Sequence, residues 1–570
     1  MELILWSLSA IVFAVYFAYR YLTRNFNYWA KRGIPGPKPL VGFGNTLSAF
    51  LNEPTDVEKD WIQKYGKIYG VYEANTPILT VAEPELIKQI MVKDSHIFSL
   101  KVTDPILKAN AHPILGKTLV ASNGQDWRRA RSVISPTFSS SRMKTMYMKV
   151  RDCLNDMLKD MEPYAKSGGE AELKTVYGNM TMDVIATCAF GTKINSYKQG
   201  NSPFINNANK VFSPNPMRLL MQMMIPTFLL KAFHMKHVIE ESANEFFFEM
   251  TRHIMNERKK SDMNYNDFIE LVMKSMNNDN QTDINANDVS YGTTAKNIYL
   301  KFISHYNSHH LIGKGGNAAD SFITKEEILA NSWDFFTTGY ESMATTLSFA
   351  SYELSRRPEV QEKLYEEIAG AVDSDGEIDY DLLQNMPFLD AVVSETLRMH
   401  TISIRLGRMA AEDYKLGDTG IVVEKGQTVE IPVYAVHHCE EFYPNHSLFD
   451  PDRWMPENSH KLVPYTYLPF GTGHRACVGT RFALMVVKLA LCHVIRSHKL
   501  VPYTYLPFGT GHRACVGTRF ALMVVKLALC HVIRRYKLVT SKNTDIPVLL
   551  KSSVLNHTPE RVILAVQSRA

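Results

Sequence analysis

The sequence predicts a mainly α-helical protein with a small β region and an N-terminal membrane anchor. Three features lead to this prediction. From about residue 122 onward, apolar residues recur chiefly at the period of a helix. Two shorter regions instead have the pattern of strands separated by turn residues. The chain also opens on an uncharged apolar segment, and its 570 residues, 45% of them hydrophobic, suffice for one large buried core.

The anchor is predicted from residues 3–19, which are uncharged, apolar and followed by basic residues. Such a length just crosses a hydrocarbon layer of ~30 Å. A cleaved signal peptide is the alternative, but the bulky residues that follow offer no small-residue cleavage site. The basic flank should stay in the cytosol. We therefore expect an anchor at 1–24, a basic and Pro/Gly-rich hinge at 25–45, and a cytosolic globular domain at 46–570.

Three further segments are predicted in chain order. Residues 67–91 alternate like a pair of strands and then become helical at Pro84. The polar stretch 277–320 has little periodicity and predicts a loop insertion. Residues 414–437 have the pattern of short strands with glycine turns.

Two helices carry clear start and stop signals. The letters TKEE from Thr324 form a capping box with Glu327, and the helical pattern continues until Pro358 forbids it. A second helix begins at Pro387, a residue suited to the first helical position, and it carries the letters ETLR.

Charge and cysteine content exclude some classes of protein. The net charge of +5 comes without a long block of Lys and Arg, so nucleic acid is not an expected partner. The seven cysteines form no dense framework, which predicts reduced thiols rather than disulfides.

One segment is duplicated: residues 459–496 recur without a substitution at 497–534. Each copy contains FGTGHRACVG, with Cys477 in the first copy and Cys515 in the second. A cysteine at a helix N-terminus is favoured as a thiolate, and a thiolate is a soft ligand for one metal. The glycines let the backbone approach a flat ligand closely. For a cysteine alone, a structural role at the start of a core helix is the alternative.

On this loop the chain resembles the cytochromes P450, whose haem-binding pattern is F-x-x-G-x-R-x-C-x-G. The letters ETLR at 395–398, FDPDRW at 449–454 and WRRAR at 127–131 match three further motifs of that family. The resemblance covers nearly the whole chain and is greatest to the microsomal group that contains families 3 and 13. It implies the P450 fold and a b-type haem whose iron takes one of the two cysteines as its axial ligand.

The resemblance also implies which residues hold the haem. Glu395 and Arg398 lie three residues apart on one helix face, and with Arg453 they would form a buried network under the haem. The propionate partners would be Trp127, Arg131, Arg405 and the loop arginine, which is Arg475 or Arg513. For any single arginine, a surface salt bridge is the alternative.

The stretch TGYES at 338–342 matches the oxygen-activation stretch of the family. Gly339 would leave room for dioxygen, while Glu341 and Ser342 would relay protons. Thr338 replaces the usual small residue and Ser342 replaces the usual threonine, whose methyl group restricts χ1, so we expect a looser relay. Helix packing is the alternative reading of this stretch.

The resemblance implies a monooxygenase that hydroxylates apolar small molecules, such as xenobiotics, sterols or fatty acids, at the endoplasmic reticulum membrane. Because no GxGxxG follows a strand, NADPH electrons should arrive through a separate NADPH-cytochrome P450 reductase, with cytochrome b5 as a further partner. Two alternatives stay open: a haem-thiolate isomerase or dehydratase, and a duplicated chain without activity.

The fold has room for only one of the two identical cysteine loops. The first copy is in register with the upstream Arg453, and the second with the downstream strand segment. Extra length is tolerated best in the polar turn 456–461, so we favour Cys515 and Arg513 as the site residues. An error in the gene model is the alternative origin of the duplication.

Overall fold

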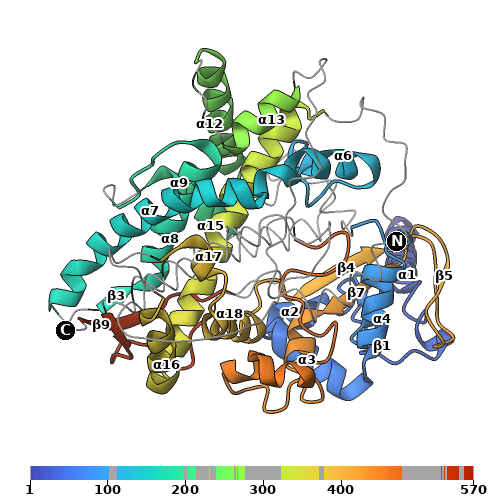
Figure 1. Cartoon of the computed structure of the whole chain (residues 1–570). Helices are drawn as coiled ribbons and strands as arrows, with labels where there is room; N and C mark the ends of the chain where they lie inside the picture. The colour runs from blue at the N-terminus through green and yellow to red at the C-terminus, as the bar shows by residue number, and fades with distance from the viewer. Residues whose placement is uncertain are drawn as a thin grey trace.

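The structure is a computed structural model that describes most of the chain. The described residues are 2–101, 112–167, 170–197, 202–212, 239–276 except 262, 264 and 266, 322–371, 378–477, 536–550 and 558–568, with the single positions 230, 528 and 532. Helices make up most of this part, with one small sheet on the side of the N-terminus and another near the C-terminus (Figure 1). The predicted mainly helical fold with a small β region is confirmed. The predicted loop insertion at 277–320 lies outside the described residues.

The helices differ widely in length. The longer ones are α1 (Glu2–Thr23), α3 (Pro54–Tyr65), α6 (Gly124–Ile134), α7 (Ser140–Ser167), α8 (Leu173–Phe190), α9 (Pro203–Phe212), α12 (Glu241–Lys259), α13 (Phe268–Met276), α15 (Lys325–Ser355), α16 (Pro358–Ala369) and α18 (Pro387–Met399). Short turns of helix connect them, and these are α2 (Thr46–Leu51), α4 (Pro84–Lys88), η2 (Gln89–Lys93), η3 (Leu115–Lys117), η4 (Ser135–Phe138), α17 (Tyr380–Leu383), α19 (Val433–His437), η6 (Pro451–Trp454) and η7 (Pro456–Lys461).

The strands form three small sheets. The first has the order β1-β2-β7-β4, in which β2 and β7 are parallel and the other pairs are antiparallel. Its strands are β1 (Ile68–Glu73), β2 (Thr76–Val81), β4 (Arg405–Met409) and β7 (Thr428–Pro432). The second joins β3 (Glu170–Glu172), β9 (Ile563–Ser568) and β8 (Tyr536–Val539), and the third joins β5 (Tyr414–Lys415) and β6 (Val422–Val423). The strand patterns predicted at 67–91 and 414–437 are therefore confirmed.

The longest described helix, α15, begins and ends where the sequence predicts. Thr324 accepts a hydrogen bond from the Glu327 N–H, and the Glu327 side chain accepts one from the Thr324 N–H, which completes the capping box. The 31 residues of α15 extend about 46 Å at 1.5 Å per residue. Pro358 then starts α16.

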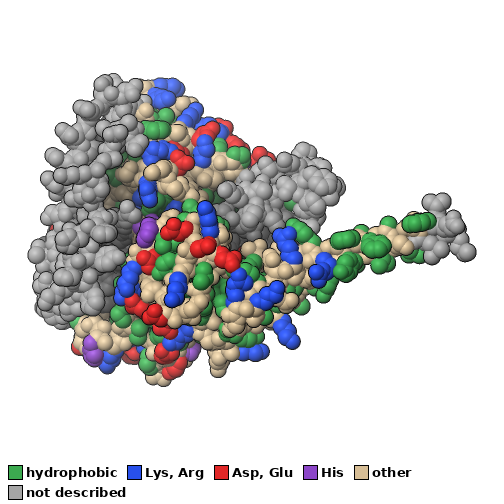
Figure 2. Space-filling view, turned by 90° about the vertical axis from the view of Figure 1, so that its right-hand side faces the viewer, with side chains coloured by type: hydrophobic (Ala, Val, Ile, Leu, Met, Phe, Trp, Pro, Cys, Tyr) green, Lys and Arg blue, Asp and Glu red, His purple; other side chains and the backbone are tan. Residues whose placement is uncertain are grey.

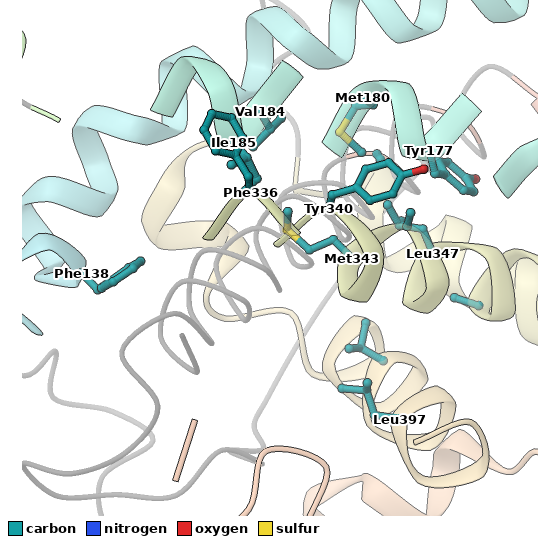
Figure 3. Close-up of a cluster of buried hydrophobic side chains, with 14 of the residues drawn as sticks. Phe138, Tyr177, Met180, Val184, Ile185, Phe336, Tyr340, Met343, Leu347 and Leu397 are labelled. Atoms are coloured by element: carbon teal, nitrogen blue, oxygen red, sulfur yellow. The ribbon is translucent and has the colours of Figure 1, made fainter. Parts of the chain in front are cut away.

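Helices α8 and α15 pack closely against each other. A Cβ added to Gly339 on α15 would lie 2.6 Å from Ile185 Cδ1, and one added to Gly178 on α8 would lie 3.2 Å from the Tyr340 ring. Figure 3 shows the apolar side chains between the two helices, among them Tyr177, Met180, Val184, Ile185, Phe336, Tyr340, Met343 and Leu347. Burial of each such side chain stabilises the fold by roughly 1.5–3 kcal/mol.

The N-terminal helix α1 extends away from the body of the protein, with hydrophobic side chains along its length (Figure 2). Trp6 and Phe17, for example, are 76% and 65% exposed. Within the described residues, however, no helix combines the length and the hydropathy needed to cross a membrane.

The segment predicted as a stiff, extended hinge, residues 25–45, packs against the first sheet. Trp29 is buried, and its indole ring occupies the space in which a Gly70 side chain would lie. Its indole N–H donates to the Val71 carbonyl (3.1 Å), and the Gly70 N–H donates to the Pro35 carbonyl (2.8 Å). The buried aromatic residue and the backbone hydrogen bonds at the sheet edge hold this proline-rich segment against the domain.

Both copies of the repeat contribute residues to the described part of the structure. The first copy is described as far as Cys477, where its loop contacts the rest of the domain. From the second copy, Ala528 and Val532 are buried in the main hydrophobic core, a few residues before β8. The described core therefore combines the loop of the first copy with core residues of the second.

Candidate functional site

A glycine-rich loop that leads to Cys477 organises the candidate site. The Cys477 N–H donates to the Phe470 carbonyl (2.9 Å) and closes the loop. Gly473 has φ of 72°, and a Cβ there would lie 1.6 Å from the Met91 carbonyl oxygen. Only glycine permits both the positive φ and this approach to the chain at η2.

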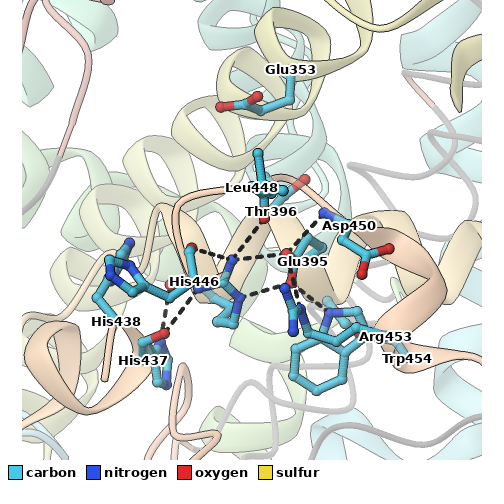
Figure 4. A network of polar contacts seen from close by, with 12 residues as sticks. Glu353, Glu395, Thr396, His437, His438, His446, Leu448, Asp450, Arg453 and Trp454 are labelled. Carbon is cyan, nitrogen blue, oxygen red and sulfur yellow. Dashed lines mark hydrogen bonds and ion pairs between the residues drawn. The ribbon is translucent and has the colours of Figure 1, made fainter. Parts of the chain in front are cut away.

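Behind the loop, Glu395 and Arg398 on α18 form a completely buried pair (Figure 4). Arg398 donates from Nε and Nη2 to the two carboxylate oxygens of Glu395, both at 2.8 Å. Its remaining N–H groups donate to the carbonyls of His437, His446 and Leu448. Every group of this guanidinium is directed at an acceptor, as a buried charge requires.

The segment that contains η6 completes the network around Glu395. The Glu395 carboxylate accepts three further hydrogen bonds. The donors are Arg453 Nε (3.3 Å), Trp454 Nε1 (2.8 Å) and the Asp450 N–H (3.0 Å). The three residues named by the sequence motifs, Glu395, Arg398 and Arg453, therefore lie together in one network.

His437 connects this network to the loop, and no sequence motif pointed to it. Its Nδ1 lies 3.2 Å from the Arg398 carbonyl, and its Nε2 accepts a hydrogen bond from the Leu468 N–H (2.8 Å). Burial, together with the charge of Arg398, lowers the pKa of His437 to about 3, so the ring is neutral at physiological pH. A neutral imidazole with Nδ1 protonated can make both contacts.

On the other side of the loop, Arg475 is held by neutral acceptors on the segment that leads into α6. It donates to the Ser99 and Ser122 carbonyls at 3.2 and 2.8 Å and to the Asn123 amide oxygen at 2.7 Å. Its guanidinium also lies 4.2 Å from the centre of the Trp127 ring.

Arg131 reaches the same loop, because its Nη1 donates to the Ala476 carbonyl at 3.0 Å. Trp127 and Arg131, which lie one helical turn apart on α6, thus contact neighbouring residues of the first copy's loop, Arg475 and Ala476. The structure brings together three of the predicted propionate partners.

Two further cations complete this group, and sequence reasoning missed both. Arg408 on β4 is 4% exposed, and burial and Arg475 lower its pKa to about 10. Lys101 is half-buried, and burial and the charges of Arg408 and Arg475 lower its pKa to about 8, although Asp334 acts in the opposite direction. Neither makes an ion pair with a carboxylate of the described residues. We call Lys101, Arg131, Arg408 and Arg475 the cationic cluster.

The prediction for Arg405 needs correction. Its Nε donates to Glu58, and its Nη1 lies 3.7 Å from Glu430. Arg405 and Arg408 are three residues apart on β4, so they project from opposite faces of the sheet. Arg408 is the strand residue that faces the loop.

The middle of α15 presents a polar face to open space. Thr338 is exposed and Ser342 is half-buried, although nearly all other residues of this helix are buried. Gly339 lies beside them, but the position of its missing side chain is blocked by Ile185 on α8. Helix packing is thus sufficient to require this glycine.

Glu341 points to a different set of residues. Its carboxylate accepts hydrogen bonds from Lys174 at the start of α8 (3.2 Å) and from Thr558 (2.9 Å). Lys174 also donates to the Thr558 hydroxyl (3.1 Å), so the three side chains form a closed group. Neither Lys174 nor Thr558 carries a recognisable sequence motif.

Comparison with known proteins identifies the family. A family model described as Cytochrome P450 matches residues 34–503 and again 498–565, so the match breaks near the start of the second copy. The chain belongs to the cytochrome P450 family. It is similar to Cytochrome P450 3A2 of Rattus norvegicus, 31% identical over 86% of this chain and 90% of the relative. It is also 32% identical to Cytochrome P450 3A11 of Mus musculus over the same shares.

Membership makes this P450 a haem-dependent monooxygenase whose iron takes a cysteine thiolate. The described residues fit this cofactor. Haem carries two anionic propionates, and the cationic cluster offers positive charge, of which Arg408 and Lys101 make no ion pair with a carboxylate of the described residues. Beside the cluster, the buried Ser122 hydroxyl has no hydrogen-bond partner among the described residues. The Trp127 indole N–H makes no hydrogen bond within the described part of the chain.

The cysteines of this P450 are in different states. Cys153, Cys188 and Cys439 are free thiols, whereas Cys477 is disulfide-bonded to a partner outside the described residues. The prediction of reduced thiols was therefore wrong for Cys477. Because a disulfide sulfur carries no thiolate charge, Cys477 can ligate iron only after reduction.

The preference for Arg513 and Cys515 of the second copy stays a prediction. The loop that contacts α6 through Arg475 and Arg131 is that of the first copy. Arg513 and Cys515 lie outside the described residues. The polar turn 456–461, the predicted place for extra length, is instead the ordered helix η7.

Proposed function

We propose that this P450 hydroxylates apolar small molecules, such as xenobiotics, sterols or fatty acids, with electrons from NADPH delivered by a separate reductase. Cytochrome b5 is a further partner in this proposal. The observation that carries it is the position of the cationic cluster beside the Cys477 loop, together with the exposed polar stretch of α15. The cationic cluster would bind the haem propionates, and the polar stretch of α15 would border the substrate.

We assign each residue a role that its contacts allow. Lys101, Arg131, Arg408, Arg475 and the Trp127 N–H hold the propionates, and Cys477 supplies the thiolate. Bound haem contributes the electron transfer and O₂ chemistry. The Ser342 hydroxyl passes protons into the open space. Glu341 supplies these protons: once its carboxylate leaves Lys174, it takes up a proton from solvent and passes it to Ser342.

We further propose that the enzyme is attached to the endoplasmic reticulum membrane by its N-terminal segment, with the catalytic domain in the cytosol. The support is the exposed apolar surface of α1 and the basic residues that follow it. Removal of residues 1–24 should release the protein from membranes and leave haem absorption intact, because the core begins at Trp29.

The reduced carbon-monoxide difference spectrum of the full chain tests the haem-thiolate assignment. In reducing buffer we expect the thiolate-type band in the parent chain, its loss in Cys477→Ser and its retention in Cys515→Ser. The opposite pattern for the two variants would assign the iron to the second copy and overturn our assignment. A parent chain without haem would favour the alternative of an inactive duplicated protein.

A second arm of the same experiment tests the reaction. Testosterone is incubated with the holoenzyme, NADPH and a purified P450 reductase, and each component is left out in turn. We expect hydroxylated product only with all of them present. A normal thiolate spectrum without NADPH-dependent turnover of any apolar probe would favour a haem-thiolate isomerase or dehydratase.

A further inference from the structure

An acidic side chain on the same side of α15 as Thr338 and Ser342 has no role in the site described so far. Asp334 precedes Thr338 by four residues and Ser342 by eight, so the three form one stripe along the helix. Thr338 is exposed and Ser342 is half-buried, which shows that the stripe borders open space. Asp334 lies at one end of this stripe and is 7% exposed.

The Asp334 carboxylate is not neutralised by a described residue. Within that part of the chain it makes no ion pair and accepts no hydrogen bond, and only its backbone carbonyl is used, by the hydroxyls of Thr337 and Thr338. Its carboxylate is not among the fully enclosed polar atoms without a partner, so the side chain keeps a small accessible surface. Burial raises the pKa of Asp334 to about 6, against the opposing charge of Lys101.

Haem binding weakens the positive field of Lys101, which partly offsets the negative charge of Asp334. Lys101 is the cation whose charge reaches Asp334, and it belongs to the cationic cluster with Arg408 and Arg475. In the holoenzyme the two propionates neutralise that cluster, so the positive field at Asp334 weakens. At neutral pH most Asp334 side chains are charged, and a buried charge without a partner is unfavourable. A cation in the open space beside α15 would remove this penalty.

We propose that Asp334 binds the ammonium group of cationic amine substrates whose bodies are apolar. This inference rests on the monooxygenase function proposed above and narrows its substrate class. Eight residues separate Asp334 from Ser342, or about 12 Å along the helix. If the ammonium nitrogen of a substrate binds to Asp334, we expect oxidation at carbons that lie within about 12 Å of that nitrogen.

Equilibrium dialysis of the holoenzyme with a matched pair of probes tests this inference. The cation is 1-benzyl-1-methylpiperidinium, which is charged at every pH and cannot ligate iron through nitrogen. Its neutral isostere is 1-benzyl-1-methylcyclohexane. We expect the parent enzyme to prefer the cation, and Asp334→Asn to reduce the ratio of the two affinities at least tenfold. Asp334→Glu, which keeps the charge, should restore part of the preference.

The pH dependence supplies a second readout. The affinity of the parent enzyme for the cation should fall as the pH drops through about 6, because Asp334 becomes protonated. The Asp334→Asn enzyme should lack this fall. Lys101, Arg408 and Arg475 are the charged groups nearest to this titration, and all three remain protonated at these pH values.

The haem content and the carbon-monoxide spectrum separate the possible failures. If both are normal and Asp334→Asn leaves the affinity ratio unchanged, the amine inference is wrong and Lys101 is the true partner of Asp334. If the parent chain shows no thiolate spectrum, the proposed function itself fails.

Discussion

Two regions of this P450 bury charged side chains, and they do so in opposite ways. Around Glu395 and Arg398, both completely buried, each charged group meets an opposite charge or a hydrogen-bond partner. Around Arg408 and Asp334, the charges are buried but make no ion pair within the described residues. The first arrangement stabilises the protein by itself, whereas the second becomes favourable only when ligands arrive.

The electrostatic consequences follow from this difference. Lys101, Arg408 and Arg475 all have a pKa below the ordinary range, and Asp334 has one above it, which means that each group is held where its charge is disfavoured. Such strain is typical of sites that bind charged ligands. The haem propionates would neutralise the buried cations, and the ammonium group of an amine would neutralise Asp334.

The largest expected effect comes from breaking the satisfied network. Glu395→Gln removes the negative charge that Arg398, Arg453 and the Trp454 N–H share, and leaves Arg398 buried without a counter-charge. We expect a loss of about 3–5 kcal/mol in the free energy of unfolding, measured by urea denaturation. The exposed Glu359→Gln on α16 serves as the control and should change it by less than about 0.5 kcal/mol. Equal effects of the two changes would contradict the structural role of the network.

The second prediction concerns the cationic cluster. Arg408→Leu should stabilise the haem-free protein by about 1–2 kcal/mol, because it removes a buried charge without a carboxylate partner. The same change should weaken haem binding at least tenfold, measured by haem titration.

Arg405→Leu is the matched control on the same strand. It leaves the buried Glu58 without its partner, so it should destabilise the haem-free protein while haem affinity stays near that of the parent. If Arg405→Leu weakened haem binding more than Arg408→Leu, the assignment of the two strand arginines would have to be reversed.

The third prediction is a pH dependence of stability. The pKa of Asp334 is about 6 in the folded protein and 3.8 as its ordinary value, so the folded state binds more protons between these limits. The contribution of Asp334 to the free energy of unfolding therefore falls as the pH rises from about 4 to 6. Asp334→Asn should remove this fall and make the haem-free protein about 2–3 kcal/mol more stable than the parent at pH 7. Thermal denaturation at pH 4 and pH 7 measures the difference, with the exposed Asp418→Asn as a control that changes neither value.

Much of the fold could be predicted because its signals are local. The capping box at Thr324, the N1 proline at Pro387 and the alternating residues of β1 and β2 each act within a few residues. The motif around Cys477 identified the family for a related reason, since a cofactor loop is a short run of residues with fixed spacing.

The site could be predicted only in part. Spacing placed Glu395 and Arg398 on one helix face, but it could not reveal that His437, from another segment, links them to the loop. It likewise gave no reason to expect that Glu341 is held by Lys174 and Thr558, which lie 167 and 217 residues away in the chain.

The sequence by itself determined the family, the helical character and the identity of the haem-binding motif, because each depends on residues that are neighbours in the chain. Only the tertiary structure decided that Arg408 rather than Arg405 faces the loop, since the two differ only in the sheet face from which they project. The same holds for the repeat: its two copies are identical, so no local property distinguishes Cys477 from Cys515. The contacts of Arg475 with Ser122 and Asn123 join the loop of the first copy to a distant part of the chain, and these tertiary contacts are the support for our proposal of Cys477.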